Sequence, residues 1–245
     1  MRRGAQFAAV CTVAVLVLVG CGQRHVPAKP KTPYGGVADL PEKLSADGTT
    51  ITVGDPEASL TVHLYEDPRC PYCKEFETTG GAPELQDATV QREARTQYTL
   101  ASFLYDRLGG TGSKKAVNAL RAALAEGKFA EYHAVLYANQ PDESVDGYTD
   151  ASLLKLARQV EGLRSPAFDA AVKSMKYRSF VAASQKAYEQ AGGTKEPDGP
   201  GTPTAVINNV RIPLNYNGML YDRTVFAGLL QRIHDDPGQW QDTDL

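Results

Sequence analysis

The stretch that decides the fold is Ser59–Phe76, SLTVHLYEDPRCPYCKEF, in which two cysteines stand three positions apart. In its first half Leu60, Val62 and Leu64 alternate with more polar residues, which predicts a strand. Pro71 then favours the first turn of a helix, because a proline lacks the N–H that would have no partner there. The sequence therefore predicts a strand that brings the cysteine pair to the start of a helix.

This placement gives the two cysteines different properties. Cys70 would cap the N-terminus of the helix, where unpaired amides and the helix dipole stabilise a thiolate and lower its pKa. Cys73 would lie one turn further along the same face. We therefore expect Cys70 to be the exposed, attacking sulfur and Cys73 to be the sheltered, resolving sulfur. Thiol–disulfide exchange requires this asymmetry.

The N-terminal residues 1–20 have the features of a secretory signal. A basic start precedes sixteen almost wholly apolar residues, fewer than the roughly 20 that a membrane-spanning helix needs. The following Leu18–Cys21, LVGC, resembles the bacterial lipoprotein box, which implies that Cys21 is lipidated and anchors the chain to a membrane. An uncleaved signal anchor is the alternative. Cleavage would remove Cys11 and leave Cys70 and Cys73 as the only unmodified cysteines, in an oxidising compartment.

The sequence argues against two other roles of a cysteine pair, a zinc site and a structural disulfide. A zinc site needs four ligands, but the exported chain has no second cysteine pair, and His63, His133 and His234 lie far apart in the sequence. A structural disulfide across two intervening residues closes almost no loop, so it removes little entropy from the unfolded chain. Redox chemistry is therefore the favoured use of the pair.

Composition and its variation along the chain predict one folded domain with flanking segments. The chain has 245 residues, 42% of them hydrophobic and 22% charged, which is ordinary for a globular protein with a core. A net charge of −3 argues against a nucleic-acid partner. Residues 21–45 are rich in Pro, Lys and Gly and are predicted to be a flexible tether. The domain is predicted over residues 46–237, and residues 238–245 are predicted to be a polar tail.

The order of predicted elements indicates the fold class. Residues from about 110 to 192 read as helices only, whereas strands are expected on both sides of them. A central mixed sheet flanked by helices, with one helical insertion at about 110–192, therefore explains the α/β pattern better than two consecutive domains. Strands are predicted at 49–54, 59–66, 97–106 and in a hairpin at 204–212, and further helices at 70–79, 83–94 and 222–236.

A second motif completes a resemblance to a known family. Gly201–Thr204, GTPT, stands before the predicted hairpin and closing helix. Together with CPYC after a strand, this pattern resembles the DsbA-like thiol–disulfide oxidoreductases, which have a thioredoxin fold. The resemblance covers about residues 50–234. It implies a cis peptide bond before Pro203, beside the disulfide, and a backbone at Thr202 that pairs with the substrate chain.

The resemblance also implies roles, partners and a place. Cys70 attacks and Cys73 resolves, while Pro71 and Tyr72 tune the redox potential. No cofactor is implied beyond the Cys70–Cys73 disulfide. The partners would be exported cysteine-containing proteins and a membrane or extracytoplasmic redox partner. The protein would act on the extracytoplasmic face of the cell membrane.

The sequence departs from the family at one position and leaves alternatives open. These folds often carry a buried acid six residues before the first cysteine, where this chain has Leu64. Glu66 and Asp67 are the nearby candidates for proton transfer, or both are simply solvated. Two other functions are a copper-delivery lipoprotein that binds through Cys70, Cys73 and a histidine, and a redox-inactive binding module. The direction of electron flow also remains open.

Overall fold

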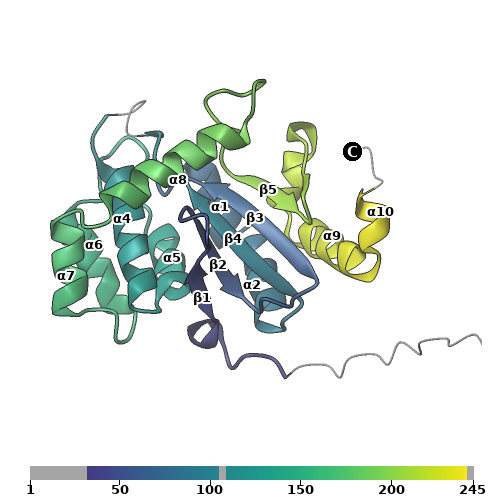
Figure 1. The fold of residues 1–245 in the computed structure, drawn as a ribbon, viewed down its shortest axis with the longest axis horizontal. Helices are drawn as coiled ribbons and strands as arrows, with labels where there is room; N and C mark the ends of the chain where they lie inside the picture. The colour runs from purple at the N-terminus through teal and green to yellow at the C-terminus, as the bar shows by residue number, and fades with distance from the viewer. Residues whose placement is uncertain (1–31, 105–108, 242–245) are drawn as a thin grey trace, which may run out of the picture. The chain divides into compact units, whose positions relative to one another are not determined.

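The computed structural model describes residues 32–104 and 109–241. The predicted signal sequence and Cys21 lie outside these residues. Six strands form one sheet in the order β1-β2-β4-β3-β5-β6 (Figure 1). β3 and β4 are parallel and the other neighbours are antiparallel, which confirms the predicted mixed sheet. The strands span Glu42–Leu44 (β1), Thr50–Gly54 (β2), Leu60–Glu66 (β3), Ala94–Leu100 (β4), Thr204–Ile207 (β5) and Val210–Arg211 (β6).

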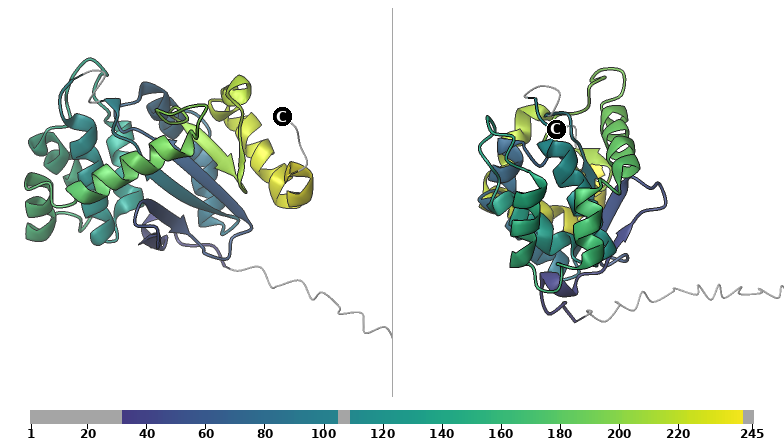
Figure 2. Two further views of the ribbon diagram at one scale, coloured as in Figure 1. Left: turned by 45° about the horizontal axis from the view of Figure 1, so that its top comes forward. Right: turned by 90° about the vertical axis from the view of Figure 1, so that its left-hand side faces the viewer.

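Helices flank the sheet, and the described residues between β4 and β5 that form regular structure are all helical. This confirms the predicted helical insertion. Its helices α4 to α7 gather at one end of the sheet, α8 runs across the sheet, and α9 and α10 lie at the other end (Figure 2). The helices span Pro71–Thr78 (α1), Ala82–Val90 (α2), Gly112–Ala125 (α4), Phe129–Ala138 (α5), Asp150–Leu156 (α6), Pro166–Lys173 (α7), Arg178–Ala191 (α8), Arg223–Asp235 (α9) and Pro237–Gln241 (α10).

The strand before the cysteines has the predicted alternation. Every second residue of β3, from Leu60 to Glu66, is buried. Leu60, Val62 and Leu64 enter a core with side chains of α2 and α9. The same period of two carries the carboxyl group of Glu66 into the interior, because successive side chains of a strand point to opposite faces. A carboxyl group is thus buried four residues before Cys70.

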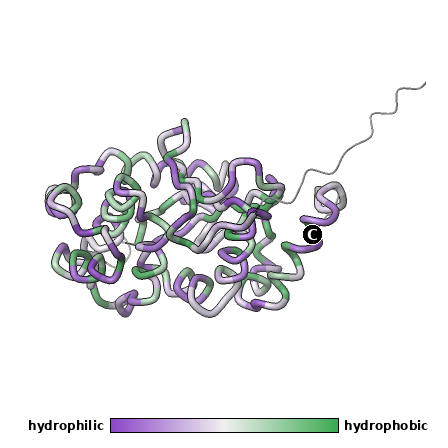
Figure 3. Tube along the Cα trace, turned by 90° about the horizontal axis from the view of Figure 1, so that it is seen from below, coloured by the Kyte–Doolittle hydropathy of each residue, from purple (hydrophilic) through white to green (hydrophobic). Residues whose placement is uncertain are grey.

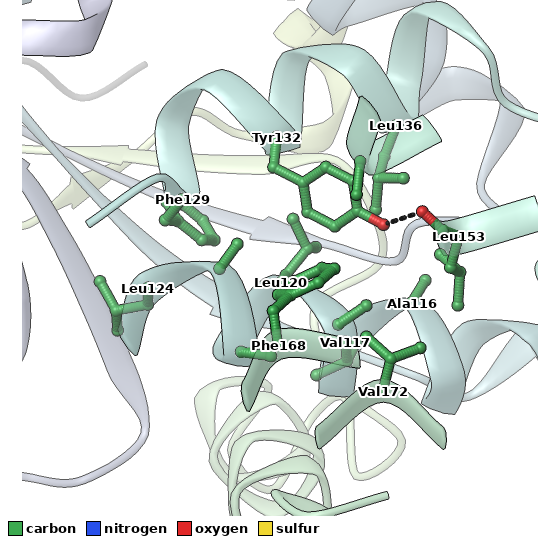
Figure 4. Close-up of a cluster of buried hydrophobic side chains, with 14 of the residues drawn as sticks. Ala116, Val117, Leu120, Leu124, Phe129, Tyr132, Leu136, Leu153, Phe168 and Val172 are labelled. Carbon is green, nitrogen blue, oxygen red and sulfur yellow. Dashed lines mark hydrogen bonds between the residues drawn. The ribbon is translucent and has the colours of Figure 1, made fainter. Parts of the chain in front are cut away.

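The insertion has its own hydrophobic core, shown in Figure 4. Tyr132 of α5 and Phe168 of α7 meet edge to face with ring centroids 5.7 Å apart. The hydroxyl of Tyr132 donates a hydrogen bond of 2.8 Å to the carbonyl of Leu153 in α6, so its one polar atom is satisfied in the core. Tyr132 and Phe168 therefore pack α5, α6 and α7 together.

The predicted tether is wrong in its second half. Residues 42–44 form β1, which pairs antiparallel with β2 and covers the hydrogen-bonding edge that this strand would otherwise expose. The amide of Tyr34 donates to the carbonyl of Val90 over 2.9 Å, and Leu40 is buried. The carboxylate of Glu42 accepts hydrogen bonds from the first amides of α5. A three-residue strand is too short to show a period in a Pro- and Gly-rich segment.

Two further boundaries differ from the sequence prediction. The strand expected at 97–106 is β4, Ala94–Leu100, because the helix before it ends at Val90 and Arg92 takes a positive φ of 68°. The predicted polar tail is wrong at its start, since Trp240 in α10 is only 5% exposed. The Nε1 of Trp240 donates a 2.7 Å hydrogen bond to the carbonyl of Ile207, which ties this segment to the end of β5.

Within the described residues, no helix has the length and hydrophobicity needed to cross a bilayer. Figure 3 shows polar residues interspersed with apolar ones along the helices, as expected where one side of a helix faces the core and the other faces water.

Candidate active site

Cys70 is the N-cap residue of α1, as the sequence predicts, with Pro71 in the first helical turn. Cys73, one turn further on, is completely buried, whereas Cys70 is 5% exposed. The expectation of an exposed Cys70 is therefore wrong in degree, because Leu104 and the Thr202 backbone cover it. As expected, Cys70 is the more exposed of the two cysteines.

The GTPT segment lies directly beside Cys70. The peptide bond between Thr202 and Pro203 is cis, as the resemblance implied, and Pro203 is buried. The Sγ of Cys70 donates a hydrogen bond of 3.3 Å to the carbonyl oxygen of Thr202. The fold thus brings the two motifs together at one point.

The surroundings shift the pKa values of the two thiols in opposite directions. The pKa of Cys70 is lowered to about 7, mainly by a hydrogen bond from Cys73, with further help from Thr202 and the amides of Cys73 and Tyr72, and against the effect of burial. Burial, followed by the hydrogen bond and charge of Cys70 and the charge of Glu66, raises the pKa of Cys73 well above its usual range. Near neutral pH the reduced site therefore carries its negative charge on Cys70.

Behind the cysteines lies a buried cluster of two acids and a histidine. His133 Nε2 lies 3.0 Å from Glu66 Oε2, and His133 Nδ1 lies 3.7 Å from Glu77 Oε2. Burial raises the pKa of Glu66 to about 8, with a hydrogen bond from Glu77 opposing, and raises the pKa of Glu77 well above its usual range. Burial lowers the pKa of His133. Burial therefore favours the neutral form of each of the three groups.

Asp67, the other acid considered from sequence, has structural partners instead. Its carboxylate accepts hydrogen bonds from the amides of Arg69 and Leu104 and from the hydroxyl of Ser113. Burial, the largest influence, raises the pKa of Asp67 to about 6, although these hydrogen bonds and the charge of Arg69 lower it. Asp67 thus joins the loop before the cysteines to the insertion, and Glu66 is the acid next to Cys73.

Two further side chains secure the active-site loop. The guanidinium of Arg69, which is 3% exposed, donates to the carbonyls of Gly109 and Glu143 over 2.9 Å each. The amide of Gln140 donates to the carbonyls of Pro68 and Cys70 over 2.8 and 2.9 Å. The position of Cys70 therefore depends on residues of the insertion.

Sequence reasoning missed most of this supporting shell. Glu77 stands four residues after Cys73, so helical spacing could have placed it on the same side of α1. The period of two in β3 could likewise have marked Glu66 as buried. His133 and Gln140 lie on or after α5, at least sixty residues from the cysteines, and no local pattern connects them.

The same cluster is the place where a metal ligand set converges. In the described part of the chain, Glu66, Glu77 and His133 form the one group of three potential ligands, with their atoms within 4.8 Å of one another. Neither sulfur belongs to this group. The copper alternative needs a histidine beside both cysteines, and among the described residues none is placed there. Carboxylate oxygens are also unlike the soft sulfur ligands that Cu(I) prefers.

A shallow groove of about 260 Å³ opens beside Cys70. Tyr72, between the cysteines, is 61% exposed at this surface. The rings of Phe103 and Tyr188 stack with centroids 5.3 Å apart and form an aromatic wall. The lining residues are Cys70, Pro71, Tyr72, Phe103, Leu104, Glu143, Tyr188, Asp198, Gly199, Gly201 and Thr202.

Solved structures with similar folds include thiol–disulfide oxidoreductases. BdbD of Bacillus subtilis has a TM-score of 0.62 and 19% identity, with 84% of this chain and 100% of that chain covered. MdbA of Corynebacterium diphtheriae, a thiol-disulfide oxidoreductase, has a TM-score of 0.60 and 18% identity over 82% and 95% of the two chains. DsbA of Chlamydia trachomatis has a TM-score of 0.59 and 20% identity over 78% and 93%. These likenesses confirm the fold that the resemblance implied.

No curated protein matches the sequence. A family model, described as thioredoxin, matches residues 46–220, which include β2 to β5, the complete insertion, both cysteines and the Thr202-Pro203 segment. This match spans most of the chain, and the sheet, the CPYC helix start and the cis-proline loop agree with it. The chain belongs to the thioredoxin family.

Proposed function

We propose that this protein exchanges disulfides with other proteins through Cys70 and Cys73. The observation that supports the proposal best is the separation of the two thiol pKa values at one helix start. Cys70 has a pKa of about 7 and borders a groove, while the pKa of Cys73 is raised and its side chain is buried. One sulfur is thus suited to meet a client and the other to close the disulfide.

The exchange proceeds in two balanced steps. In the oxidised protein, a client thiolate attacks the Sγ of Cys70, the Cys70–Cys73 bond breaks, and Cys73 leaves with the electron pair as a thiolate. A second client thiolate then attacks the client sulfur of this mixed disulfide, and Cys70 leaves as a thiolate. The client loses two electrons and gains a disulfide, and the protein holds two electrons until a redox partner accepts them.

Glu66 supplies the proton that Cys73 needs when it leaves. A buried thiolate is costly, and the pKa of Cys73 is raised well above its usual range. The pKa of Glu66 is about 8, so this carboxyl group is protonated at neutral pH and transfers its proton downhill to Cys73. A cavity of about 90 Å³ is lined by Glu77 and His133, which gives the cluster a route for exchanging protons with water.

The proposed direction is donation of disulfides to exported proteins. A pKa near 7 for the attacking cysteine also occurs in reducing members of the fold, so this value does not fix the direction. The oxidising compartment indicated by residues 1–20 favours donation. Accordingly the clients are exported cysteine-containing proteins, and a membrane or extracytoplasmic redox partner reoxidises the pair.

The proposed location is the extracytoplasmic face of the cell membrane, with a lipid on Cys21 as the anchor. The support is the sequence pattern of residues 1–21, and residues 22–31 serve as the tether to the folded domain. Metabolic labelling with a radioactive fatty acid tests this part. The wild-type protein should be labelled, whereas Cys21→Ser should be unlabelled and lost from the membrane fraction. Equal labelling of both would refute lipidation at Cys21.

The reduction potential of the Cys70–Cys73 pair, measured against glutathione, tests the function itself. A potential above about −200 mV, with oxidation of a dithiol peptide, supports donation. A potential below about −250 mV, with reduction of insulin, would assign the opposite direction. No reversible disulfide between the two cysteines would refute the exchange function and leave the redox-inactive binding module.

A further inference from the structure

We propose that the groove beside Cys70 selects client segments that carry a lysine or arginine next to the reacting cysteine. This proposal rests on the exchange function above and specifies its substrates. It is based on the charges, the aromatic wall and the position of the groove relative to the Cys70 sulfur.

Two carboxylates border the groove from different parts of the chain. Glu143 belongs to the loop between α5 and α6, and Asp198 to the loop between α8 and β5. Both residues are exposed. Among the groove-lining residues that the structure describes there is no lysine, arginine or histidine. A bound cation would therefore meet two acidic residues and, among the described residues of the lining, no cationic one.

Two described cations of the active-site loop and helix, Arg69 and Lys74, face other partners. Arg69 lies buried beneath the loop, where its guanidinium donates to the backbone carbonyls of Gly109 and Glu143. The guanidinium of Arg69 also lies 3.8 Å from the carboxylate of Asp146, whose negative charge compensates its positive charge. Lys74 directs its ammonium group to the carbonyl of Gln140 over 3.3 Å. Neither cation lines the groove, so the carboxylates of Glu143 and Asp198 remain available to a client.

The aromatic wall suits the same kind of side chain. Phe103 and Tyr188 stack at an interplanar angle of 11°, and Tyr72 stands exposed on the same groove. A cation near an aromatic face is attracted by the negative centre of the ring, and an arginine also stacks on it. The apolar stem of lysine or arginine would lie along these rings while its charged end reaches a carboxylate.

The size of the groove places this contact close to the reacting sulfur. A volume of about 260 Å³ that includes Cys70 itself holds one or two residues of a client chain. The backbone of Gly201 and Thr202 forms one side of it, so a client segment that pairs there would put its cysteine on Cys70 and a neighbouring side chain against the wall. The recognised residue is therefore adjacent, or nearly adjacent, to the client cysteine.

The test uses peptides that differ only in the residue beside a single cysteine pair: arginine, alanine or glutamate. For the wild-type protein we expect kcat/KM for peptide oxidation to rank arginine above alanine above glutamate, and added salt to reduce the difference. Glu143→Gln and Asp198→Asn should each lower the rate for the arginine peptide about two- to five-fold, and the double variant should erase the ranking. Glu161→Gln, an exposed acid outside the groove, is the matched control and should leave it unchanged.

A binding measurement separates this proposal from the exchange function. Serine analogues of the three peptides, which cannot react, are titrated by calorimetry against the wild-type protein and the double variant. Tighter binding of the arginine analogue to the wild type alone supports the groove assignment even if no peptide is oxidised. Equal rates and equal affinities for all three peptides, or a ranking that survives in the double variant, would overturn it. If all three peptides were oxidised at equal rates, the exchange function would stand and the proposed selectivity of the groove would be refuted.

Discussion

The Sγ of Cys70 donates a hydrogen bond to the carbonyl oxygen of Thr202 over 3.3 Å, although 132 positions separate these residues in the chain. The start of α1 and the loop before β5 meet because β3 and β5 are paired antiparallel in the sheet, with Tyr65 opposite Thr204. Their pairing brings the helix that follows β3 and the loop that precedes β5 to the same end of the sheet. The contact between Cys70 and Thr202 is therefore a product of the sheet topology.

The two cysteines should respond differently to substitution. Cys70→Ser should abolish peptide oxidation, because the sulfur that borders the groove is lost. Cys73→Ser should still attack a client disulfide through Cys70 but, without a resolving sulfur, should accumulate a mixed disulfide. Non-reducing gels and mass spectrometry measure the mixed disulfide, which a reductant should cleave. Full activity of Cys70→Ser would contradict the proposed chemistry.

The reactivity of Cys70 should follow the ionisation of its thiol. Because its pKa is lowered to about 7, the rate at which iodoacetamide alkylates the reduced protein should reach half its maximum near pH 7. Cys73→Ala should move this midpoint upward, since the Cys73 hydrogen bond is the largest cause of the shift. Mass spectrometry identifies the modified sulfur. A wild-type midpoint near the value of an ordinary cysteine, about 8.5, would contradict the prediction.

The same ionisation predicts how stability depends on redox state. The pKa of Cys70 is lower in the folded state than in the unfolded chain, so its contribution is present above the unfolded value and lost as pH falls through about 7. The reduced protein should therefore gain stability relative to the oxidised protein as pH rises from about 7 to about 8.5. Urea unfolding of both forms across this range measures the difference. An unchanged difference would show that folding does not shift the Cys70 pKa.

Glu66→Gln should change both stability and the resolving step. The pKa of Glu66 is raised to about 8, so the folded protein holds a proton that the unfolded chain releases, and stability should fall as pH rises from about 4.5 to 8. Because glutamine does not ionise, Glu66→Gln should not lose stability over this pH range, and it should be more stable than the wild-type protein at pH 8. Peptide oxidation should slow because Cys73 loses its proton donor. Glu75→Gln, an exposed acid of the same helix, is the control and should change neither property.

Arg69→Ala should destabilise the protein by about 3 kcal/mol, because two backbone carbonyl groups lose a charged donor that is itself buried. The variant should also loosen the insertion near Gly109 and Glu143 and raise hydrogen exchange there. The surface pair of Arg223 and Glu84 is the comparison, since exposed ion pairs contribute less than about 1 kcal/mol. Urea unfolding measures both variants. Equal losses for Arg69→Ala and Arg223→Ala would contradict the assigned role.

Trp240→Ala should destabilise the domain by about 3–4 kcal/mol, since a large aromatic side chain leaves the core. Trp240→Phe keeps most of the packing and removes the donor to the Ile207 carbonyl, so its cost should be about 1–2 kcal/mol. Thermal unfolding followed by circular dichroism measures both. A wild-type melting temperature for Trp240→Ala would restore the view of this segment as a solvated tail.

The local sequence determined the elements that carry the redox pair. Alternation in Leu60–Leu64, the proline at position 71 and the spacing of Cys70 and Cys73 act over a few residues, so strand, helix start and sulfur order followed from chain geometry and local hydrogen bonding. The helical insertion was also readable, because helical periodicity persists over many turns. The three-residue β1 and the buried Trp240 escaped prediction because they are stabilised by contacts with distant segments and by no pattern of their own.

Only the tertiary structure decided the environment of the pair. Strand pairing places Thr202 beside Cys70. From the insertion, Gln140 contacts the carbonyl of Cys70 and His133 contacts Glu66. The direction and size of a pKa shift depend on burial and on neighbours within a few ångströms, and the sequence does not state who these neighbours are. The sequence thus identified the cysteine pair. The fold distinguishes Glu66 from Asp67, because Glu66 is buried against His133 whereas Asp67 accepts hydrogen bonds from backbone amides.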